Sequence, residues 1–255
     1  MIPLNECIRL INVSKQFHKM TAVNSISFDV AKGSLCAFLG SNGAGKSTTM
    51  NMMITLLMKT SGKIYIDGLD MDYERDRIRQ KIGVVFQEDI LDGEFTVYEN
   101  LYYRGGLYLP NRRNLKNRIL EISQLLQIDP ILKKTYHTCS GGQKRLVQIG
   151  RAILPQPQLL ILDEPTIGLD PLAREHVWSI LKKLNTELHM TIFYSTHYME
   201  EACLANEVCM IHNGELLICQ EVNELYRRTS KEYTSAQLQQ LYLSLLEKYE
   251  SKVSD

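Results

Sequence analysis

Apolar and polar residues alternate near the start of the chain and then give way to continuous apolar runs. Residues 26–30 alternate between the two classes, a pattern typical of a strand with one buried face. Residues 35–39 are apolar at every position, as expected of a central strand covered on both faces, and they lead into a glycine-rich loop. Residues 46–58 then show helical spacing. The opening region therefore predicts a strand, a second strand, a loop and a helix, in that order.

Further short apolar runs, each bounded by turn residues, predict more strands. They lie at 64–66, 82–86, 159–162, 191–194, 208–211 and 215–218. The last two flank Asn213-Gly214, the strongest short-range signal for a two-residue hairpin turn. A helix predicted over 173–185 separates the strands at 159–162 and 191–194, and this order implies that the two strands pair in parallel.

Helical spacing dominates two other parts of the chain. Between Thr96 and Lys134 the apolar residues recur every three or four positions, with Pro110 as one of the breaks. We interpret this stretch as a helical subdomain inserted into the sheet domain. A final amphipathic helix is predicted to begin near Ser235, and its apolar face comprises Leu238, Leu241, Leu245 and Tyr249.

The composition narrows the function classes. The chain has 255 residues, of which 44% are hydrophobic and 23% are charged, so a compact globular fold with a sizeable core is expected. Its 29 basic and 29 acidic side chains balance, and we expect no nucleic-acid partner. No run reaches the roughly 18 apolar residues of a bilayer-spanning helix, and the first residues lack a signal-peptide pattern. If the chain works at a membrane, another protein must anchor it.

The cysteines indicate a reducing compartment. Six are present, they form no C-x-x-C pair, and several lie in apolar stretches where a small buried thiol fits. We therefore expect reduced, cytosolic thiols.

A glycine-rich loop separates the apolar run 35–39 from the helical run that follows. It fits G-x-x-x-x-G-K-[ST], and its backbone N–H groups and the following helix N-terminus would surround phosphate groups. Lys46 would bridge the outer phosphates, and Ser47 would ligate Mg²⁺. A chance glycine-rich turn is the alternative. The candidate nucleotide-binding residues of this loop are Gly40, Ser41, Asn42, Gly43, Ala44, Gly45, Lys46, Ser47 and Thr48.

Two carboxylates close the strand at 159–162, at the sheet edge where ligands of open α/β folds bind. Asp163 would hold Mg²⁺ through water, whereas Glu164 would orient and polarise the water that attacks the γ-phosphate. The alternative is an exposed acidic pair that opens a turn before Pro165, an interpretation that the nearby phosphate loop disfavours.

A second candidate anion site lies where Ser140-Gly141-Gly142-Gln143 opens another helix. On the alternative interpretation this is only a well-capped helix, and Lys144, Arg145 and Arg151 form its solvated face. If the helix start is an anion site, the chain combines two phosphate-binding loops with a single Mg²⁺ site.

In order and spacing, these motifs resemble those of ATP-binding-cassette (ABC) transporter ATPases over nearly the whole chain. The loop Gly40–Ser47 corresponds to their Walker A loop, Leu159–Asp163 with Glu164 to their Walker B strand, and Cys139–Gln143 to their signature. Cys139 replaces the usual leucine of the signature, which puts only local packing in doubt.

The resemblance implies an α/β P-loop NTPase fold of the ABC type, with a mainly parallel central sheet, an antiparallel β subdomain and an inserted α-helical subdomain. We predict an ATPase domain over 1–225, with the helical subdomain inserted at about 88–155, and a helical tail over 226–255.

The resemblance also assigns roles to single residues. Gln87 falls at the Q-loop and would reach Mg²⁺ and the γ-phosphate, Asp170 falls at the D-loop, and His197 falls at the switch histidine that contacts the γ-phosphate. Phe17 stands where the family places an aromatic ring that stacks on adenine, although it could equally be a core residue. The predicted catalytic residues are thus Lys46, Gln87, Glu164 and His197, the metal ligands are Ser47, Gln87 and Asp163, and Ser140, Gly141, Gly142, Gln143 and Asp170 complete the nucleotide contacts.

The function implied by the resemblance is that of a peripheral subunit on the cytoplasmic face of a membrane. Two such cassettes, in a homodimer or a heterodimer, clamp two Mg-ATP head to tail and drive transport through separate membrane subunits. Segments 95–101 and 168–174 and the short tail resemble exporters of drugs, antibiotics and lipids, which indicates export. The alternatives are a catalytically inactive regulatory cassette, which the pair Glu164 and His197 disfavours, and a soluble family ATPase that acts on ribosomes or in DNA repair.

The membrane partner is predicted to contact residues 87–101. The segment 88–93 is polar, contains glycine and follows Gln87, as expected of a loop that moves with the state of the nucleotide. An ordinary surface loop is the alternative.

Overall fold

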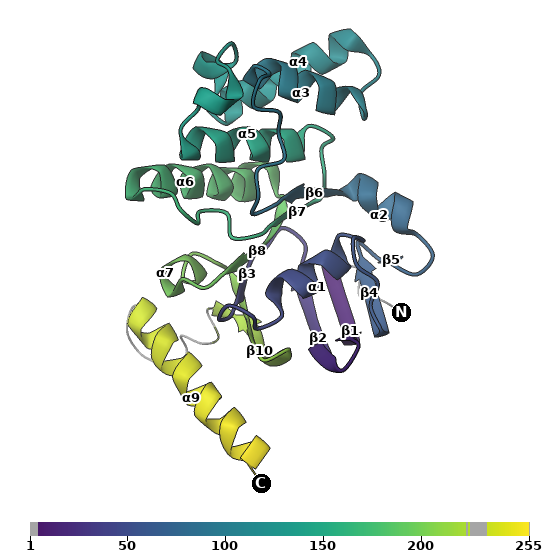
Figure 1. The fold of residues 1–255 in the computed structure, drawn as a ribbon, viewed down its shortest axis with the longest axis vertical. Coiled ribbons are helices and arrows are strands. Elements are labelled where there is room, and N and C mark those ends of the chain that lie inside the picture. Colours follow the sequence, from purple (N-terminus) through teal and green to yellow (C-terminus); the bar gives the residue numbers. More distant parts are fainter. Residues whose placement is uncertain (1–4, 223, 225–233, 255) are drawn as a thin grey trace. The chain divides into compact units, whose positions relative to one another are not determined.

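The structure is a computed structural model that describes residues 5–222, 224 and 234–254 (Figure 1). The chain forms two compact units. The first, which we call the phosphate-loop unit, comprises residues 1–79 and 191–255; the second, the signature unit, comprises residues 80–190.

The phosphate-loop unit contains an antiparallel sheet with the strand order β2-β1-β4-β5. Along β2 the apolar residues Ile26, Phe28 and Val30 are buried while their polar neighbours are exposed, so the alternation predicted from the sequence is confirmed. The strands of this sheet are β1 (Glu6–Phe17), β2 (Met20–Ala31), β4 (Ser61–Ile66) and β5 (Leu69–Asp70).

A second, mainly parallel set of strands in this unit has the order β10-β9-β3-β8. Strand β3 is buried at all five positions and pairs in parallel with both β8 and β9, as predicted for a central strand. The hairpin between β9 and β10 is confirmed, because Asn213 (φ 46°) and Gly214 (φ 80°) form its two-residue turn. The strands are β3 (Leu35–Leu39), β8 (Thr191–Thr196), β9 (Glu207–His212) and β10 (Glu215–Glu221).

The prediction of reduced thiols is wrong for one pair. Cys209 on β9 and Cys219 on β10 lie directly opposite each other in the hairpin register, and a disulfide joins them. The sequence alone did not fix the register that brings two cysteines ten residues apart face to face. The remaining cysteines, Cys7, Cys36, Cys139 and Cys203, are not in disulfides.

The helices of the phosphate-loop unit differ from the predicted ones at their ends. The helix predicted over 46–58 stops at Met53, because Thr55 adopts a left-handed conformation (φ 67°) that an α-helix cannot continue. The final helix begins at Ser235 as predicted, and Leu238 on its apolar face is fully buried. These helices are α1 (Lys46–Met53), α7 (Met199–Ala202) and α9 (Ser235–Ser254), while α2 (Arg75–Lys81) leads into the signature unit.

The signature unit combines two parallel strands with a group of helices (Figure 1). Helix α5 packs against α3 and α4 and also against α6, and six consecutive residues from Arg145 to Gly150 are buried. The elements are β6 (Ile82–Val85), α3 (Val97–Gly106), α4 (Arg112–Leu125), α5 (Gly141–Ile153), β7 (Leu159–Leu162) and α6 (Pro171–Leu188), with 3-10 turns at Asp129–Ile131 and Tyr136–Thr138. Within the described residues, no helix combines the length and the apolar character that a bilayer crossing requires.

Candidate nucleotide-binding and hydrolysis site

The phosphate loop follows β3 and ends where α1 begins. Gly45 is the N-cap of α1 and has φ 104°, a conformation that residues with a Cβ rarely adopt. A Cβ at this position would lie 2.7 Å from the carbonyl oxygen of Ala22, so only glycine fits. The tip of the loop, residues 41–43, is exposed. The loop therefore presents backbone N–H groups and a helix N-terminus to the solvent, as a phosphate-binding loop must.

Lys46 is held on this loop by its own backbone. Its side chain is only 5% exposed, and its Nζ donates hydrogen bonds to the carbonyl oxygens of Gly40 (2.7 Å) and Ser41 (3.1 Å). The ammonium group is thus fixed beside the loop tip, while the next residue, Ser47, is exposed in the first turn of α1. This arrangement places a cation and a hydroxyl next to the N–H groups of the loop.

The structure brings His197 to the same sheet edge as the phosphate loop. Strands β3 and β8 are parallel with Leu39 opposite Thr196, and the N–H of Gly40 donates to the carbonyl oxygen of Thr196 (3.3 Å). His197 follows β8 directly and is half-buried. The end of β8 is anchored below it, because the hydroxyl of Thr196 donates to the carboxylate of the buried Glu201 (2.6 Å). The phosphate loop and the predicted switch histidine are therefore neighbours within one unit.

Phe17 is not a core residue, so that alternative is wrong. The ring lies at the end of β1 and is 37% exposed, and Nζ of Lys15 lies 4.8 Å from its centroid. An exposed aromatic ring is available for stacking on a base, and the predicted contact with adenine stays a prediction.

The signature unit brings a second group of predicted residues to one edge. Strands β6 and β7 are parallel with Val85 opposite Leu162, and the N–H of Asp163 extends this pairing by donating to the carbonyl oxygen of Val85 (2.9 Å). Gln87 follows β6 and is exposed, while Asp163 and Glu164 follow β7 and are half-buried. The predicted Q-loop glutamine thus follows one strand of a parallel pair, and the two carboxylates follow the other.

Glu164 adopts an unusual backbone conformation. Its φ is 44°, in the left-handed region that non-glycine residues seldom occupy. Such strain persists only where the surrounding structure imposes it, and it is frequent at active sites. The sequence pattern did not predict this backbone conformation.

The N-terminus of α5 carries a complete capping box. The Ser140 hydroxyl accepts a hydrogen bond from the N–H of Gln143 (3.3 Å), and the Gln143 side-chain oxygen accepts one from the N–H of Ser140 (3.1 Å). Ser140 and Gly141 are exposed. Ahead of them, Cys139 is buried, and burial raises the pKa of its thiol, so the residue that departs from the family pattern serves as neutral packing.

The alternative in which the basic residues of α5 form a solvated face is wrong for Arg145. Its side chain is 7% exposed, and its guanidinium donates to the carbonyl oxygen of Phe86 (2.8 Å) and to the side-chain oxygen of Gln148 (3.0 Å). Arg151 likewise donates to the carbonyl oxygen of Val84. Sequence reasoning missed these contacts, because the two carbonyl oxygens lie 59 and 67 residues away from the arginines along the chain and no local pattern links them.

Asp170 caps a helix, a structural role that is separate from its predicted contact with the nucleotide. It is the N-cap of α6, and its carboxylate accepts a hydrogen bond from the N–H of Ala173 (3.0 Å), with Pro171 in the first helical position. Its predicted contact with nucleotide stays a prediction.

Comparisons with known proteins show the family to which the chain belongs. A family model described as ABC transporter matches residues 23–167, more than half of the chain. The linearmycin resistance ATP-binding protein LnrL of Bacillus subtilis (strain 168) is 40% identical over 207 residues, which are 81% of this chain and 66% of that protein. The Nod factor export ATP-binding protein I of Rhizobium sp. (strain N33) is 39% identical over 211 residues, which are 82% of this chain and 69% of that protein.

A solved structure extends the likeness to the fold. The ATP-binding cassette MJ0796, solved as a dimer in a post-hydrolysis state with ADP and Pi, matches with a TM-score of 0.74 and 28% identity over 84% of this chain and 98% of that one. This likeness confirms the predicted fold class. The chain spans about two thirds of the length of the two named relatives.

Proposed function

The chain belongs to the ABC transporter family, as one of its ATP-binding ATPase subunits, and on this premise we propose that it powers the export of a substrate through separate membrane subunits. The names of the two relatives support export, since one describes resistance to linearmycin and the other the export of Nod factor. The observation that supports hydrolysis is that each unit gathers its share of the predicted site at one sheet edge. In one unit the phosphate loop and His197 follow paired strands, and in the other Gln87 follows the strand paired with the one that precedes Asp163 and Glu164.

The phosphate-loop unit would hold the nucleotide. The N–H groups around Gly43 and Gly45 and the N-terminus of α1 surround the phosphates, and Lys46 exchanges its bonds to loop carbonyl oxygens for bonds to the outer phosphates. The exposed ring of Phe17 stacks on the adenine. These contacts supply most of the affinity for ATP.

A magnesium ion is expected to accompany the ATP. The Ser47 hydroxyl, the Asp163 carboxylate and the Gln87 side-chain oxygen are hard oxygen donors, and all three residues are at least partly exposed. Oxygen donors of this kind suit Mg²⁺, which binds a few protein oxygens together with phosphate oxygens and water. The ion, when bound, neutralises charge on the phosphate groups.

Hydrolysis would depend on residues that follow strands. The Glu164 carboxylate orients and polarises the attacking water, and the strained backbone of this residue (φ 44°) is of a kind that is frequent at active sites. The His197 ring contacts the γ-phosphate from the edge next to the phosphate loop. Gln87 links this chemistry to the segment that follows it.

Two copies of the cassette would share two nucleotides. The exposed Ser140 and Gly141 at the N-terminus of α5 contact the phosphates held by the other copy, as the family resemblance implies. A dimer that exists because ATP bridges it must form with ATP and separate after hydrolysis. The MJ0796 cassette, itself solved as a dimer, supports this arrangement.

Sedimentation of the Glu164→Gln variant tests the proposal. We expect a dimer in Mg-ATP and a monomer in Mg-ADP or without nucleotide, because the variant binds ATP but hydrolyses it very slowly. The matched control is Lys46→Ala in the same background, which should remain monomeric in ATP. An identical distribution of species in all three conditions would contradict a nucleotide shared between copies of this chain.

Residues 87–101, which we call the docking segment, are proposed to contact the membrane subunit. The segment and the following turn of α3 carry a row of neighbouring aromatic rings, with Phe95 5.2 Å from Tyr103 and Tyr98 5.8 Å from Tyr102. Phe95 and Tyr103 are exposed. Exposed aromatic side chains are enriched in protein interfaces, and they would receive an apolar cytoplasmic helix.

A photocrosslinker at Phe95 tests this contact. We expect it to capture the membrane protein that co-purifies with the chain, with a yield that differs between ATP and ADP. The same probe at Tyr249 on α9 is the control. Capture at Tyr249 with none at Phe95 would move the docking surface to the tail.

A further inference from the structure

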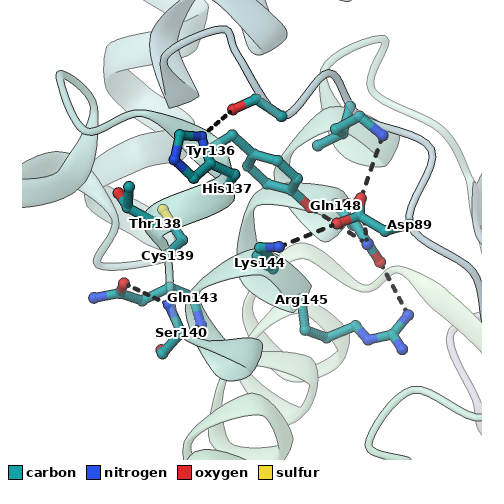
Figure 2. Close-up of polar contacts among 12 residues, drawn as sticks. Asp89, Tyr136, His137, Thr138, Cys139, Ser140, Gln143, Lys144, Arg145 and Gln148 are labelled. Carbon is teal, nitrogen blue, oxygen red and sulfur yellow. Dashed lines mark hydrogen bonds and ion pairs between the residues drawn. The ribbon is translucent and has the colours of Figure 1, made fainter.

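Four side chains of the signature unit form a polar cluster that joins the docking segment to α5 (Figure 2). We call it the Asp89 cluster, and it comprises Asp89, Tyr136, Arg145 and Gln148. One oxygen of the Asp89 carboxylate accepts hydrogen bonds from the Tyr136 hydroxyl (2.8 Å), the Gln148 amide (3.1 Å) and the N–H of Leu91 (3.2 Å). Asp89 is therefore bonded both to the turn before the signature and to the second turn of α5.

Arg145 continues the chain of hydrogen bonds to the end of β6. Its guanidinium donates to the Gln148 side-chain oxygen (3.0 Å) and to the carbonyl oxygen of Phe86 (2.8 Å), with a longer contact to the carbonyl oxygen of Gln87 (3.5 Å). Gln148 thus accepts from Arg145 and donates to Asp89. The backbone at Gln87 and the carboxylate two residues later are both fixed by side chains of α5.

The residues just before the signature hold the other end of the docking loop. The N–H of Tyr136 donates to the carbonyl oxygen of Phe95 (2.8 Å), and the N–H of His137 donates to that of Gly93 (3.0 Å). The chain from 136 to 148 therefore contacts the chain from 86 to 95 at both ends. Ser140, the N-cap of α5, lies within the first of these stretches.

The protonation states of Tyr136, Arg145 and Asp89 preserve the hydrogen bonds of the cluster. Tyr136 is 1% exposed, and burial, together with its bond to Asp89, raises the pKa of its hydroxyl far above the usual range, so it remains a donor. Arg145 is a buried cation whose direct acceptors are carbonyl and amide oxygens, and the Asp89 carboxylate is a nearby opposite charge. The Asp89 side chain is 36% exposed, with Nζ of Lys144 3.9 Å away. Replacing Asp89 by asparagine would remove that charge but keep the size of the side chain.

We propose that Asp89 is a positioning residue for the signature: acting through Tyr136 and Gln148, it fixes the N-terminus of α5 against the docking segment. The inference rests on the proposed function, in which Ser140 and Gly141 contact the nucleotide of a second copy. A displacement of the docking segment by the membrane subunit would then move these donors directly. The segment 88–93 is consequently a bonded part of the signature unit, and it moves with α5 instead of independently of it.

The proposal separates catalysis from nucleotide binding. Donors that are misplaced by a fraction of an ångström act poorly on the reacting phosphate, whereas the phosphate loop lies in the other unit and keeps its own contacts. In Asp89→Asn we expect kcat for ATP hydrolysis to fall about tenfold. The ATP-dependent dimer of Asp89→Asn/Glu164→Gln should weaken by a similar factor, while the Kd for Mg-ADP stays within about twofold of wild type.

A second variant and a control protect the result from a folding artefact. Tyr136→Phe removes only the hydroxyl, and it should lower kcat in the same direction as Asp89→Asn. The double variant should be hardly worse than either single one, because one change weakens and the other removes the same hydrogen bond. Glu121→Gln, which removes an exposed negative charge from α4, is the matched control and should leave kcat unchanged.

The outcomes can be told apart. If Glu164→Gln fails to dimerise with ATP and the wild type does not hydrolyse it, the proposed function is wrong and the inference is lost with it. If both activities are present but Asp89→Asn and Tyr136→Phe match the wild type, Asp89 does not position the signature. A parallel fall of kcat, nucleotide affinity and unfolding free energy would show that the cluster only stabilises the fold, and would also overturn the inference.

Discussion

Helices α1 and α5 both begin within glycine-containing motifs, yet the N–H groups of their first turns differ in whether a side chain caps them. The N-cap of α1 is Gly45, which has no side chain to cap the helix, whereas the N-cap of α5 is Ser140, which forms a complete capping box. An uncapped helix start leaves its N–H donors for a bound anion, while a capping box gives partners to the N–H groups of the N-cap and N3 residues and leaves the others. The comparison teaches that the residue at the N-cap, more than the glycine content, decides how strongly a helix start depends on a ligand.

The same contrast extends to the residues around each helix. Beside α1, Lys46 donates to carbonyl oxygens that phosphate groups can replace. Beside α5, the Asp89 cluster is satisfied by protein atoms alone. We therefore expect the phosphate-loop unit to gain order from the nucleotide and the signature unit to arrive preformed at its partner's nucleotide.

The largest effects should separate hydrolysis from binding. Glu164→Gln is expected to lower the rate of ATP hydrolysis by about 10²- to 10⁴-fold with nearly normal affinity, because it removes the group that polarises water. Lys46→Ala should weaken ATP binding by about 10- to 100-fold, because charged hydrogen bonds to the outer phosphates are lost. Equilibrium binding of labelled ATP and single-turnover hydrolysis measure the two effects. Wild-type turnover in Glu164→Gln would remove Glu164 from catalysis.

A smaller effect should appear in the stability of the two helix starts. Gly45→Ala is expected to cost about 2 kcal/mol or more, because the left-handed backbone and the nearby carbonyl oxygen of Ala22 exclude a Cβ. Ser140→Ala removes the capping hydroxyl and should cost about 1 kcal/mol. Urea unfolding of both variants tests the order. Equal losses of unfolding free energy would mean that the backbone at position 45 does not require glycine.

Much of this architecture is predictable because it depends on local patterns. The continuous apolar run of β3 and the Asn213-Gly214 turn each specify one conformation, and both are found. Helix α2 was not predicted, because Ile78 is its sole buried residue and so small an apolar signal gives no periodicity. The end of α1 was placed too late, because the left-handed conformation of Thr55 has no sequence signal.

In the candidate site, too, the features that depend on local sequence patterns could be predicted. Residues in contiguous motifs, such as Lys46 and Glu164, could be proposed from spacing, and the roles assigned to them stay predictions. The Asp89 cluster could not be proposed, because Asp89 lies 47 residues from Tyr136 and 59 from Gln148. Only the fold brings these side chains together, and a polar residue on a helix reads as a surface residue until its neighbours are known.

The smallest expected effect concerns pH and has opposite signs in the two units. Burial raises the pKa of Glu207 in the phosphate-loop unit, and Glu221 directly opposite on β10 adds to the rise. The capping-box bonds from Thr96 lower the pKa of Glu99 in the signature unit. A raised pKa means that the folded state binds the proton more tightly than the unfolded state does, so the contribution of Glu207 to stability is present at low pH and is lost as the pH rises.

For Glu99 the sign is reversed, so its contribution is present at neutral pH and is lost as the pH falls. Relative to wild type, Glu207→Gln should therefore be more stable at pH 7 and lose this advantage toward about pH 4. Glu99→Gln should be less stable than wild type at pH 7, and this difference should shrink as the pH falls. Glutamine retains a hydrogen-bond acceptor at both positions and can complete a capping box, so the pair isolates the charge. Urea unfolding across this pH range measures both differences, and slopes of the same sign would show that burial of Glu207 does not control its titration.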